Sequence, residues 1–269
     1  MLIRHTEVPQ SYSPAPVVNP SFWSFSIRGD VQHPLIVSYA DLQNYPFVEL
    51  SVLITHGTSK PPYSIKTGRW SGVLLSNLLS VMTIRDDVQF AHIQSANGYT
   101  TVLPFHILNT ALLATHYNGE TLTHSQGAPA RLIVPRTASF KMPKWVQTIE
   151  LTSQPKAGFW EMRGASLEGR VEPFITVEPL ASQTHNKPVQ ISGTAVDFDS
   201  RIHQVEINID SQGWVPAQIH HDDYGQTLWT IDWVPQFSGI YSVDYRALDV
   251  HRQRIATAHH PLLLQIKDS

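Results

Sequence analysis

The chain has 269 residues, of which 42% are hydrophobic, and its formal net charge is −3 at pH 7 with 15% charged residues. This length and apolar content predict one large domain or two moderate ones, and the lack of a basic stripe argues against a nucleic-acid partner. The sequence contains no cysteine, which excludes disulfides, thiolate metal ligands, iron–sulfur clusters and cysteine nucleophiles.

The N-terminal segment, residues 1–21, is polar and rich in proline and is expected to be irregular. It begins MLIRHTEVPQ, which lacks the apolar stretch of a secretory signal. No run in the sequence approaches the roughly 20 apolar residues that span a bilayer. We therefore expect a cytoplasmic protein, or a periplasmic one if a signal was removed or a partner carries it.

Short strands and short helices are expected to alternate between residue 22 and about residue 150. Residues 47–55, FVELSVLIT, have the apolar character of a strand, and the glycines and prolines of 56–70 predict an irregular loop. Ser71–Val81 presents a broad apolar face typical of a helix. Further helices are expected over Ser38–Leu42 and from Pro104 to Leu113, and further strands at 25–27, 89–95, 131–135 and 145–151. This mixture predicts an α+β domain.

The pattern changes after Pro173, where helical periodicity disappears. Apolar and polar residues then alternate in successive segments separated by turn sequences such as DFDS, DSQG and DDYG. The expected strands are 188–196, 202–209, 227–234, 239–250 and 260–267. Short strands at this spacing predict a β-sandwich, and we place the boundary between the two domains near residues 164–173.

Several colinear segments together resemble the sulfite oxidase family of molybdopterin enzymes. They are FSIRGDVQHPLIVSYADL, TGRWSGVLLSNLL, SANGYTTVLP, YNGETLTHSQGAPARLIVP, KMPKWVQTIEL and GFWEMRG, followed later by ISGTAVDFDSRIHQVEINIDSQGWVPA. The resemblance implies an α+β sulfite-oxidase-type molybdopterin-binding domain over residues 22–167. It also implies an all-β immunoglobulin-like dimerisation domain over residues 173–269.

The resemblance also assigns positions to a cofactor site and a substrate pocket. The implied cofactor-binding residues are Arg4, His5, Thr55, Gln126, Arg131 and Lys144, and the implied pocket residues are Lys60, Trp70 and Ala165. Thr55 stands where the family has the cysteine that binds molybdenum, Gln126 where it has a histidine, and Ala165 where it has a tyrosine beside the metal. Lys60 is the nearest match to an anion-binding arginine of the family.

These replacements change the chemistry that the site can support. A thiolate is a soft, strongly donating ligand, whereas the hydroxyl of Thr55 is hard and its β-branched side chain is stiff. His56 is adjacent, but neighbours in a strand point to opposite faces. Lysine also lacks the bidentate recognition of oxyanions that arginine gives. We therefore expect no metal ligand, no assigned catalytic residue and no efficient oxidation of sulfite.

Plainer interpretations stand beside these assignments. Arg131 can end a strand and pair with a local carboxylate, and Trp70 is more often a core residue than a pocket residue in such a position. The cluster His220–Asp223 is best interpreted as a solvated hairpin loop, because adjacent histidines on an extended chain point apart.

Three functional hypotheses remain open at this point. The first is a non-catalytic structural or docking subunit of a redox complex, which pairs with a second copy or with a redox partner. The second is an active molybdopterin-dependent oxidoreductase with a non-cysteine metal environment and a substrate other than sulfite. The third is an anion- or pterin-binding module. The cofactor is accordingly either none or molybdopterin.

Overall fold

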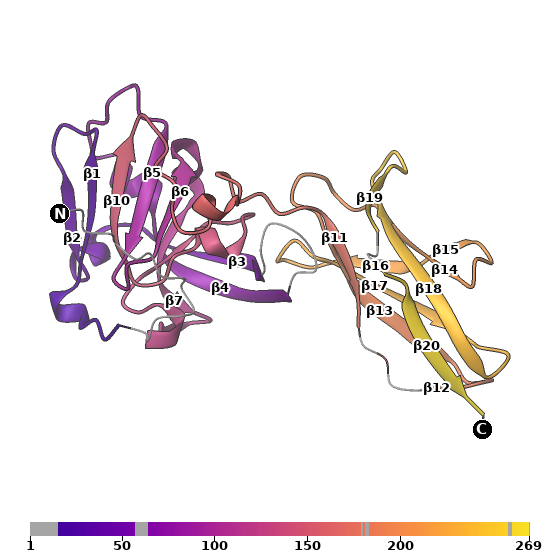
Figure 1. Cartoon of the computed structure of the whole chain (residues 1–269). Coiled ribbons are helices and arrows are strands. Elements are labelled where there is room, and N and C mark those ends of the chain that lie inside the picture. Colours follow the sequence, from indigo (N-terminus) through magenta and orange to yellow (C-terminus); the bar gives the residue numbers. More distant parts are fainter. Residues whose placement is uncertain (1–15, 57–63, 179, 181–182, 258–259, 269) are drawn as a thin grey trace. The chain divides into compact units, whose positions relative to one another are not determined.

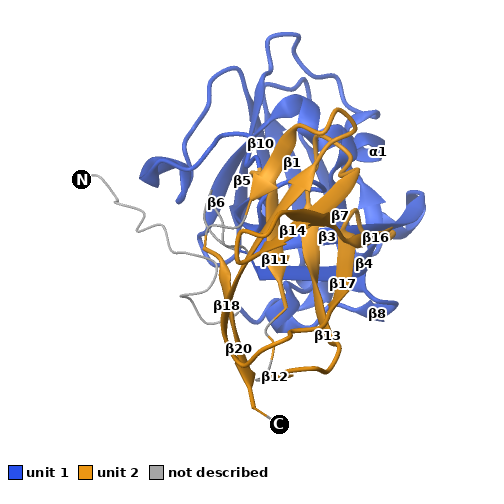
Figure 2. Cartoon of the chain, turned by 90° about the vertical axis from the view of Figure 1, so that its right-hand side faces the viewer, with its two compact units in different colours: residues 1–170 blue, residues 171–269 orange. Residues whose placement is uncertain are grey.

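The computed structural model describes residues 16–56, 64–178, 180, 183–257 and 260–268. The chain divides into two compact units, residues 1–170 and 171–269 (Figures 1 and 2). Both units are built mainly from β-strands. Arg4, His5 and Lys60, which the sequence assigned to the site, lie outside the described residues.

The described residues of the first unit form two five-stranded sheets. One has the order β2-β1-β10-β5-β6, in which only the β1–β10 pair is parallel. The other has the order β3-β4-β7-β8, with β9 paired to β7. The first sheet comprises β1 (Ser24–Gly29), β2 (Leu35–Ser38), β5 (Phe90–Ser95), β6 (Thr100–Pro104) and β10 (Val146–Thr152). The second comprises β3 (Phe47–His56), β4 (Ser64–Leu74), β7 (Leu112–Tyr117), β8 (Glu120–Thr121) and β9 (Arg131–Ile133).

One apolar core joins the two sheets of the first unit. Phe25 and Ile27 of β1 are fully buried because alternate residues of a strand point to the same face. Trp23 enters the same core, and its indole N–H donates to the carbonyl of Val146 at 3.1 Å. The strand expected at residues 25–27 is therefore confirmed.

The helices of the first unit are shorter than the sequence predicts, and of the predicted helix Ser71–Val81 only residues 75–79 are α-helical. The described residues contain a single α-helix, α1 (Leu75–Leu79), and the other helical turns are 3₁₀: η1 (Pro20–Phe22), η2 (Asp41–Asn44), η3 (Phe105–Thr110), η4 (His124–Gln126), η5 (Ser139–Lys141) and η6 (Glu161–Arg163). Residues 64–74, expected as loop and helix, form β4, whose ten ladder pairs with β3 run from Val73 to Ser64. Gly72 permits this ladder to meet β7, since a Cβ there would lie 2.1 Å from the carbonyl oxygen of Leu113.

The second unit, in its described part, also forms two sheets around one core. Their orders are β11-β13-β17-β16 and β12-β20-β18-β14-β15, with β19 paired to β18. The core takes Ile191 and Trp229 from the first of these sheets and Val205, Val243 and Leu264 from the second. The strands are β11 (Phe174–Val177), β12 (Gln183–Thr184), β13 (Val189–Val196), β14 (Gln204–Ile209), β15 (Trp214–Pro216), β16 (Gln218–His221), β17 (Thr227–Trp233), β18 (Gly239–Leu248), β19 (Arg254–Thr257) and β20 (Leu262–Lys267). The five strands predicted from the sequence correspond to β13, β14, β17, β18 and β20.

The helices in the described part of the chain are short. None of them combines the length and the hydropathy that a bilayer-spanning helix needs.

Burial of His92 makes the stability of the first unit depend on pH. His92 lies in β5 and is 5% exposed. Desolvation lowers the pKa of its imidazole, the charge of Lys156 lowers it further, and Glu150 and Glu161 oppose both. The unfolded chain therefore binds a proton more readily than the folded one. Stability is then fully present above the unfolded pKa of about 6.5 and is lost as pH falls from there toward the folded pKa.

We expect His92→Gln to reduce this loss, because the amide does not titrate. The measurement is urea unfolding of both proteins at about pH 7.5 and about pH 5.5, on either side of the ordinary histidine pKa. The wild type should lose more stability than the variant between the two conditions. Equal losses would contradict a role for His92.

Candidate functional site

One face of β4 presents a cation and an aromatic ring on either side of a glycine. Lys66, Gly68 and Trp70 alternate along the strand and so point to the same face. Tyr117 of β7 covers Gly68, where an added Cβ would lie only 2.1 Å from its ring. The Tyr117 ring is 4.9 Å from the Nζ of Lys66 and 4.6 Å from the ring of Trp70. Glycine at position 68 thus allows Lys66, Tyr117 and Trp70 to pack in a row.

Arg131, the first residue of β9, extends this row with a buried charge. The residue is 6% exposed, and its guanidinium carbon lies 5.1 Å from the centre of the Trp70 ring. Its Nε donates to the carbonyl of Met142 at 3.3 Å, and no carboxylate among the described residues pairs with it. Burial lowers the pKa of Arg131 to about 10, which still leaves it charged at neutral pH. The described residues therefore do not form the ion pair between Arg131 and a local carboxylate that the plainer interpretation expected.

Lys144 adds a second cation beside Arg131. Gly127 lies between their side-chain stems, since a Cβ there would be 2.9 Å from the Cβ of Lys144 and 3.2 Å from that of Arg131. The Nζ of Lys144 donates to the carbonyl of Ser125 at 2.6 Å. Desolvation is the first cause that lowers the pKa of Lys144, and the charges of Arg131 and Lys66 add to it.

Desolvation and the charges of Arg131, Lys66 and Lys144 affect the pKa of His56, the last residue of β3. Desolvation of its imidazole is the largest cause that lowers the pKa, although the residue is exposed overall, and Arg131, Lys66 and Lys144 follow in that order. We call His56, Lys66, Arg131 and Lys144 the basic cluster. Within the described residues no ion pair with a carboxylate involves any of these four. Such a cluster beside the rings of Trp70 and Tyr117 can bind an oxyanion, with Arg131 as the rigid donor and the lysines as point charges.

Thr55 is fully buried but stands apart from the basic cluster. In the β3–β4 ladder it pairs with Ile65, whereas His56 pairs with Ser64 and Ile54 with Lys66. The Thr55 side chain therefore points to the face opposite His56 and Lys66. Its Oγ1 has no hydrogen-bond partner among the described residues. A neutral hydroxyl in this environment lacks any described base that would remove its proton.

The remaining predicted residues have local roles. Gln126 caps η4, because its Oε1 accepts the backbone N–H of Thr123 at 2.8 Å. Ala165 follows η6, and its N–H donates to the carbonyl of Trp160 at 3.0 Å. Trp70 is a core residue at 2% exposure, as the plainer interpretation has it, and it also faces Arg131.

Sequence reasoning missed Lys66 and Tyr117 and did not assign His56 to the site. Lys66 was placed in an irregular loop because glycines and prolines surround it. The alternation in the segment IKTGRW is the signal that could have found it, because a period of two places Lys66 and Trp70 on one face of a strand.

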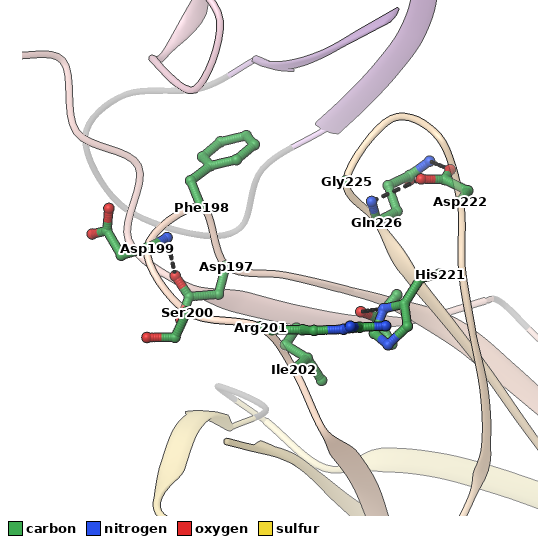
Figure 3. Close-up of a pocket in the computed structure, with 11 residues that line it drawn as sticks. Asp197, Phe198, Asp199, Ser200, Arg201, Ile202, His221, Asp222, Gly225 and Gln226 are labelled. Atoms are coloured by element: carbon green, nitrogen blue, oxygen red, sulfur yellow. Dashed lines mark hydrogen bonds between the residues drawn. The ribbon is translucent and has the colours of Figure 1, made fainter. Parts of the chain in front are cut away.

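The cavities in the described part of the second unit offer a less suitable site. One of about 310 Å³ is lined by the loops that contain Asp197 and Asp222, and Arg201 and His221 also line it (Figure 3). Asp222 accepts from the backbone N–H groups of Tyr224 and Gln226, so its charge stabilises the turn. A hairpin is present where the sequence predicted one, since β16 pairs with β17, but His220 and His221 lie in β16 and the loop begins at Asp222. No group of acidic or histidine side chains in the described residues is arranged to hold a metal ion.

Comparison with known proteins identifies relatives of the first unit and of the whole fold. Residues 12–160 match the family described as "Oxidoreductase molybdopterin binding domain". The oxidoreductase YuiH of Bacillus subtilis is 30% identical over 149 residues, which are 55% of this chain and 74% of YuiH. The Azospira oryzae protein named "Putative protein-methionine-sulfoxide reductase subunit YedZ1" is 30% identical over 102 residues, which are 36% of this chain and 38% of YedZ1.

A more distant relative and a solved structure cover more of the chain. Rat mitochondrial sulfite oxidase is 21% identical over 234 residues, which are 76% of this chain and 43% of that protein. The crystal structure of the sulfane dehydrogenase SoxCD of Paracoccus pantotrophus matches with a TM-score of 0.74 at 20% identity. The match covers 93% of this chain and 75% of the SoxCD chain, and it shows the fold.

The unpartnered hydroxyl of Thr55 leads to a prediction about the free energy of unfolding. Removing a buried hydroxyl that lacks a partner relieves its desolvation penalty, so we expect Thr55→Val to stabilise the protein by about 1 kcal/mol. The matched control is Thr101→Val, which removes a hydroxyl that donates to Glu161 at 2.6 Å and should destabilise it. Urea unfolding measures both. A loss of stability in Thr55→Val as large as that in the control would contradict the expectation.

Proposed function

The chain belongs to the oxidoreductase molybdopterin-binding domain family, which includes the sulfite oxidases, and on that premise we propose that it binds molybdopterin through the basic cluster. We propose further that it serves as a subunit of a redox complex and does not oxidise sulfite. The observation that carries the first part is Arg131, a buried cation that no described carboxylate neutralises.

The basic cluster fits the phosphate of a molybdopterin. A buried charge without a partner costs several kcal/mol, and a bound phosphate would remove that cost at Arg131. Phosphate and guanidinium match in planar, bidentate geometry, while Lys66 and Lys144 add charge that the exposed His56 can supplement on protonation. Release of their mutual repulsion would also favour binding, because the three fixed cations each lie close enough to affect the pKa of His56.

The donor set does not fit the metal end of the cofactor in the same way. When bound in a family member, molybdenum supplies two-electron redox chemistry and takes a protein thiolate as ligand. This chain has no cysteine. Its hydroxyl at the corresponding position, Thr55, is a hard group with no described base beside it and points away from the basic cluster. We therefore propose that the protein does not oxidise sulfite.

The names of two similar proteins support a role within a redox complex. YedZ1 is named as a reductase subunit, and SoxCD is a sulfane dehydrogenase. We propose that the second unit, with its two sheets around one core, is an immunoglobulin-like domain that pairs with a second copy or with a redox subunit. We place the protein in the cytoplasm, or in the periplasm if a partner or a removed signal takes it there.

One observation favours the alternative of an active enzyme with a substrate other than sulfite. The hydroxyl of Thr55 is buried without a partner, and a buried polar atom of that kind can serve a bound group. A module that only binds an anion or a pterin is the remaining alternative, and it differs from the main proposal only in lacking a partner complex.

Loading in cells tests the binding proposal. The protein is expressed in a host that makes molybdopterin, and the bound pterin is measured by fluorescence after oxidation. We expect near-stoichiometric pterin in the wild type and a loss of about tenfold or more in Lys144→Ala, since a charge-assisted hydrogen bond contributes about 1.5–3 kcal/mol. The matched control is Arg69→Gln, an exposed cation on the opposite face of β4 that pairs with Glu49 at 3.6 Å. Wild-type protein without pterin would overturn the proposal.

The metal content tests the loss of the ligand. We expect the wild type to hold little molybdenum per pterin and Thr55→Cys to raise that ratio several-fold, because a thiolate is the ligand that the metal prefers. Elemental mass spectrometry of the purified proteins measures the ratio. Stoichiometric molybdenum in the wild type would favour the active-enzyme alternative. An unchanged ratio in Thr55→Cys would show that the side chain at this position does not reach the metal.

A further inference from the structure

We propose that a buried ion pair, Lys141–Glu161, is the positioning element of the basic cluster. It fixes the segment Ala138–Trp145, here called the anchored segment, which contributes Lys144 directly and supports Arg131. The inference rests on the proposed function, because it concerns the affinity of the same site for an anion. Neither residue of the pair belongs to the basic cluster.

The pair is more deeply buried than any other ion pair among the described residues. The side chain of Lys141 is 0% exposed and that of Glu161 is 1% exposed. The Nζ of Lys141 donates to the Oε1 of Glu161 and, at 2.7 Å, to the carbonyl of Val102. The same Oε1 accepts the hydroxyl of Thr101 at 2.6 Å and the backbone N–H of Val102 at 3.3 Å. Lys141 of η5 is thereby tied to β6 and to η6 at one point.

The anchored segment contacts Thr55 at one end and Arg131 further along. Ala138 forms an isolated parallel bridge with Thr55 in β3. Four residues later, the carbonyl of Met142 accepts the Nε of Arg131 at 3.3 Å, and Lys144 follows after Pro143. Lys141 lies between these contacts. A shift of η5 would therefore move the acceptor that orients Arg131 and the backbone that holds Lys144.

Two close contacts show that η5 has little freedom around this anchor. The hydroxyl of Tyr99 donates to the carbonyl of Phe140 at 2.5 Å. A Cβ at Gly169 would lie 2.3 Å from the Cγ of Lys141, so the lysine stem fills the space above that glycine. The segment is thus held from β6, from η6 and from the chain after Gly164, all on elements outside the basic cluster.

An apolar pair would stabilise this position as well or better. The desolvation cost of a buried ion pair commonly equals or exceeds its Coulombic gain, and burial lowers the pKa of Lys141 against the opposing charge of Glu161. Glu161 also keeps one oxygen, Oε2, without a partner among the described residues. Unlike apolar side chains, the pair makes directional contacts. Four polar contacts on Lys141 and Glu161 fix one placement of η5.

The test removes both charges together, since Lys141→Met alone leaves Glu161 buried and unpaired and would unfold the region. In Lys141→Met/Glu161→Gln the amide still accepts from Thr101 and Val102, and the methionine fills the space of the lysine stem. The matched control is Glu206→Gln in the second unit, where Glu206, 3% exposed, accepts from Arg246 at 2.6 Å and Arg252 at 3.1 Å. Full-length proteins are compared by thermal unfolding, by calorimetric titration with pyrophosphate, and by hydrogen exchange.

We expect the double variant to fold and to bind pyrophosphate about tenfold more weakly than the wild type, which corresponds to 1.4 kcal/mol. The control should lose stability without a change in affinity. Exchange in the double variant should accelerate at the N–H groups of Leu132 and Trp145, which donate to Pro143 and Gly127. These two readouts separate a positioning role from a general loss of stability, which the control reproduces.

The two proposals fail in different ways. Wild-type protein that does not bind pyrophosphate would overturn the proposed function, and the exchange measurement would still decide whether the ion pair holds the anchored segment. Binding in the wild type together with affinity in the double variant within twofold of it would overturn the positioning role. Unchanged exchange at Leu132 and Trp145 would overturn it as well.

Discussion

A buried guanidinium that no described carboxylate neutralises is the constraint on which the first unit's site depends. Arg131 retains only a carbonyl, that of Met142, and the face of Trp70 as described partners. Neither neutralises a charge, so the fold tolerates Arg131 at a cost that a bound anion would remove. Gly127 and the anchored segment matter for the site because they determine where the side chains of Arg131 and Lys144 lie.

Thr55 and His56 point to different faces of β3. His56 and the basic cluster share one face, while Thr55 points to the other. In the proposed function, threonine at position 55 in place of the family's cysteine affects the metal end of the site and leaves the groups that would bind a phosphate in place. A protein that binds the cofactor but lacks the metal chemistry of its relatives is physically consistent, since anion binding and metal ligation depend on separate side chains.

The sequence predicted the strands of the second unit better than β4, because periodicity and turn residues alone identify them. Strands β13, β14, β17, β18 and β20 have turn residues between alternating segments, and these local signals agree with the fold. In β4 the signals conflict, because the apolar run from Val73 to Leu79 has the spacing of a helix. Pairing of β4 with β3 and β7, which involves residues far apart in the sequence, decides its conformation. Lys66 was missed because the glycines and prolines around it predict a loop, in which a side chain has no defined face.

Arg131 and Lys141 are buried cations of the first unit, and their different surroundings distinguish scaffold from site. Lys141 has a carboxylate, a carbonyl and a fully buried setting that is complete within the chain, apart from one oxygen of Glu161. Arg131 is nearly as buried but has no described carboxylate. Sequence alone cannot separate these cases, because both residues stand in similar short apolar segments and the partner Glu161 is distant from Lys141 along the chain. Charge compensation is visible only in three dimensions, and the lack of a described carboxylate at Arg131 is the reason we propose that an anion binds there.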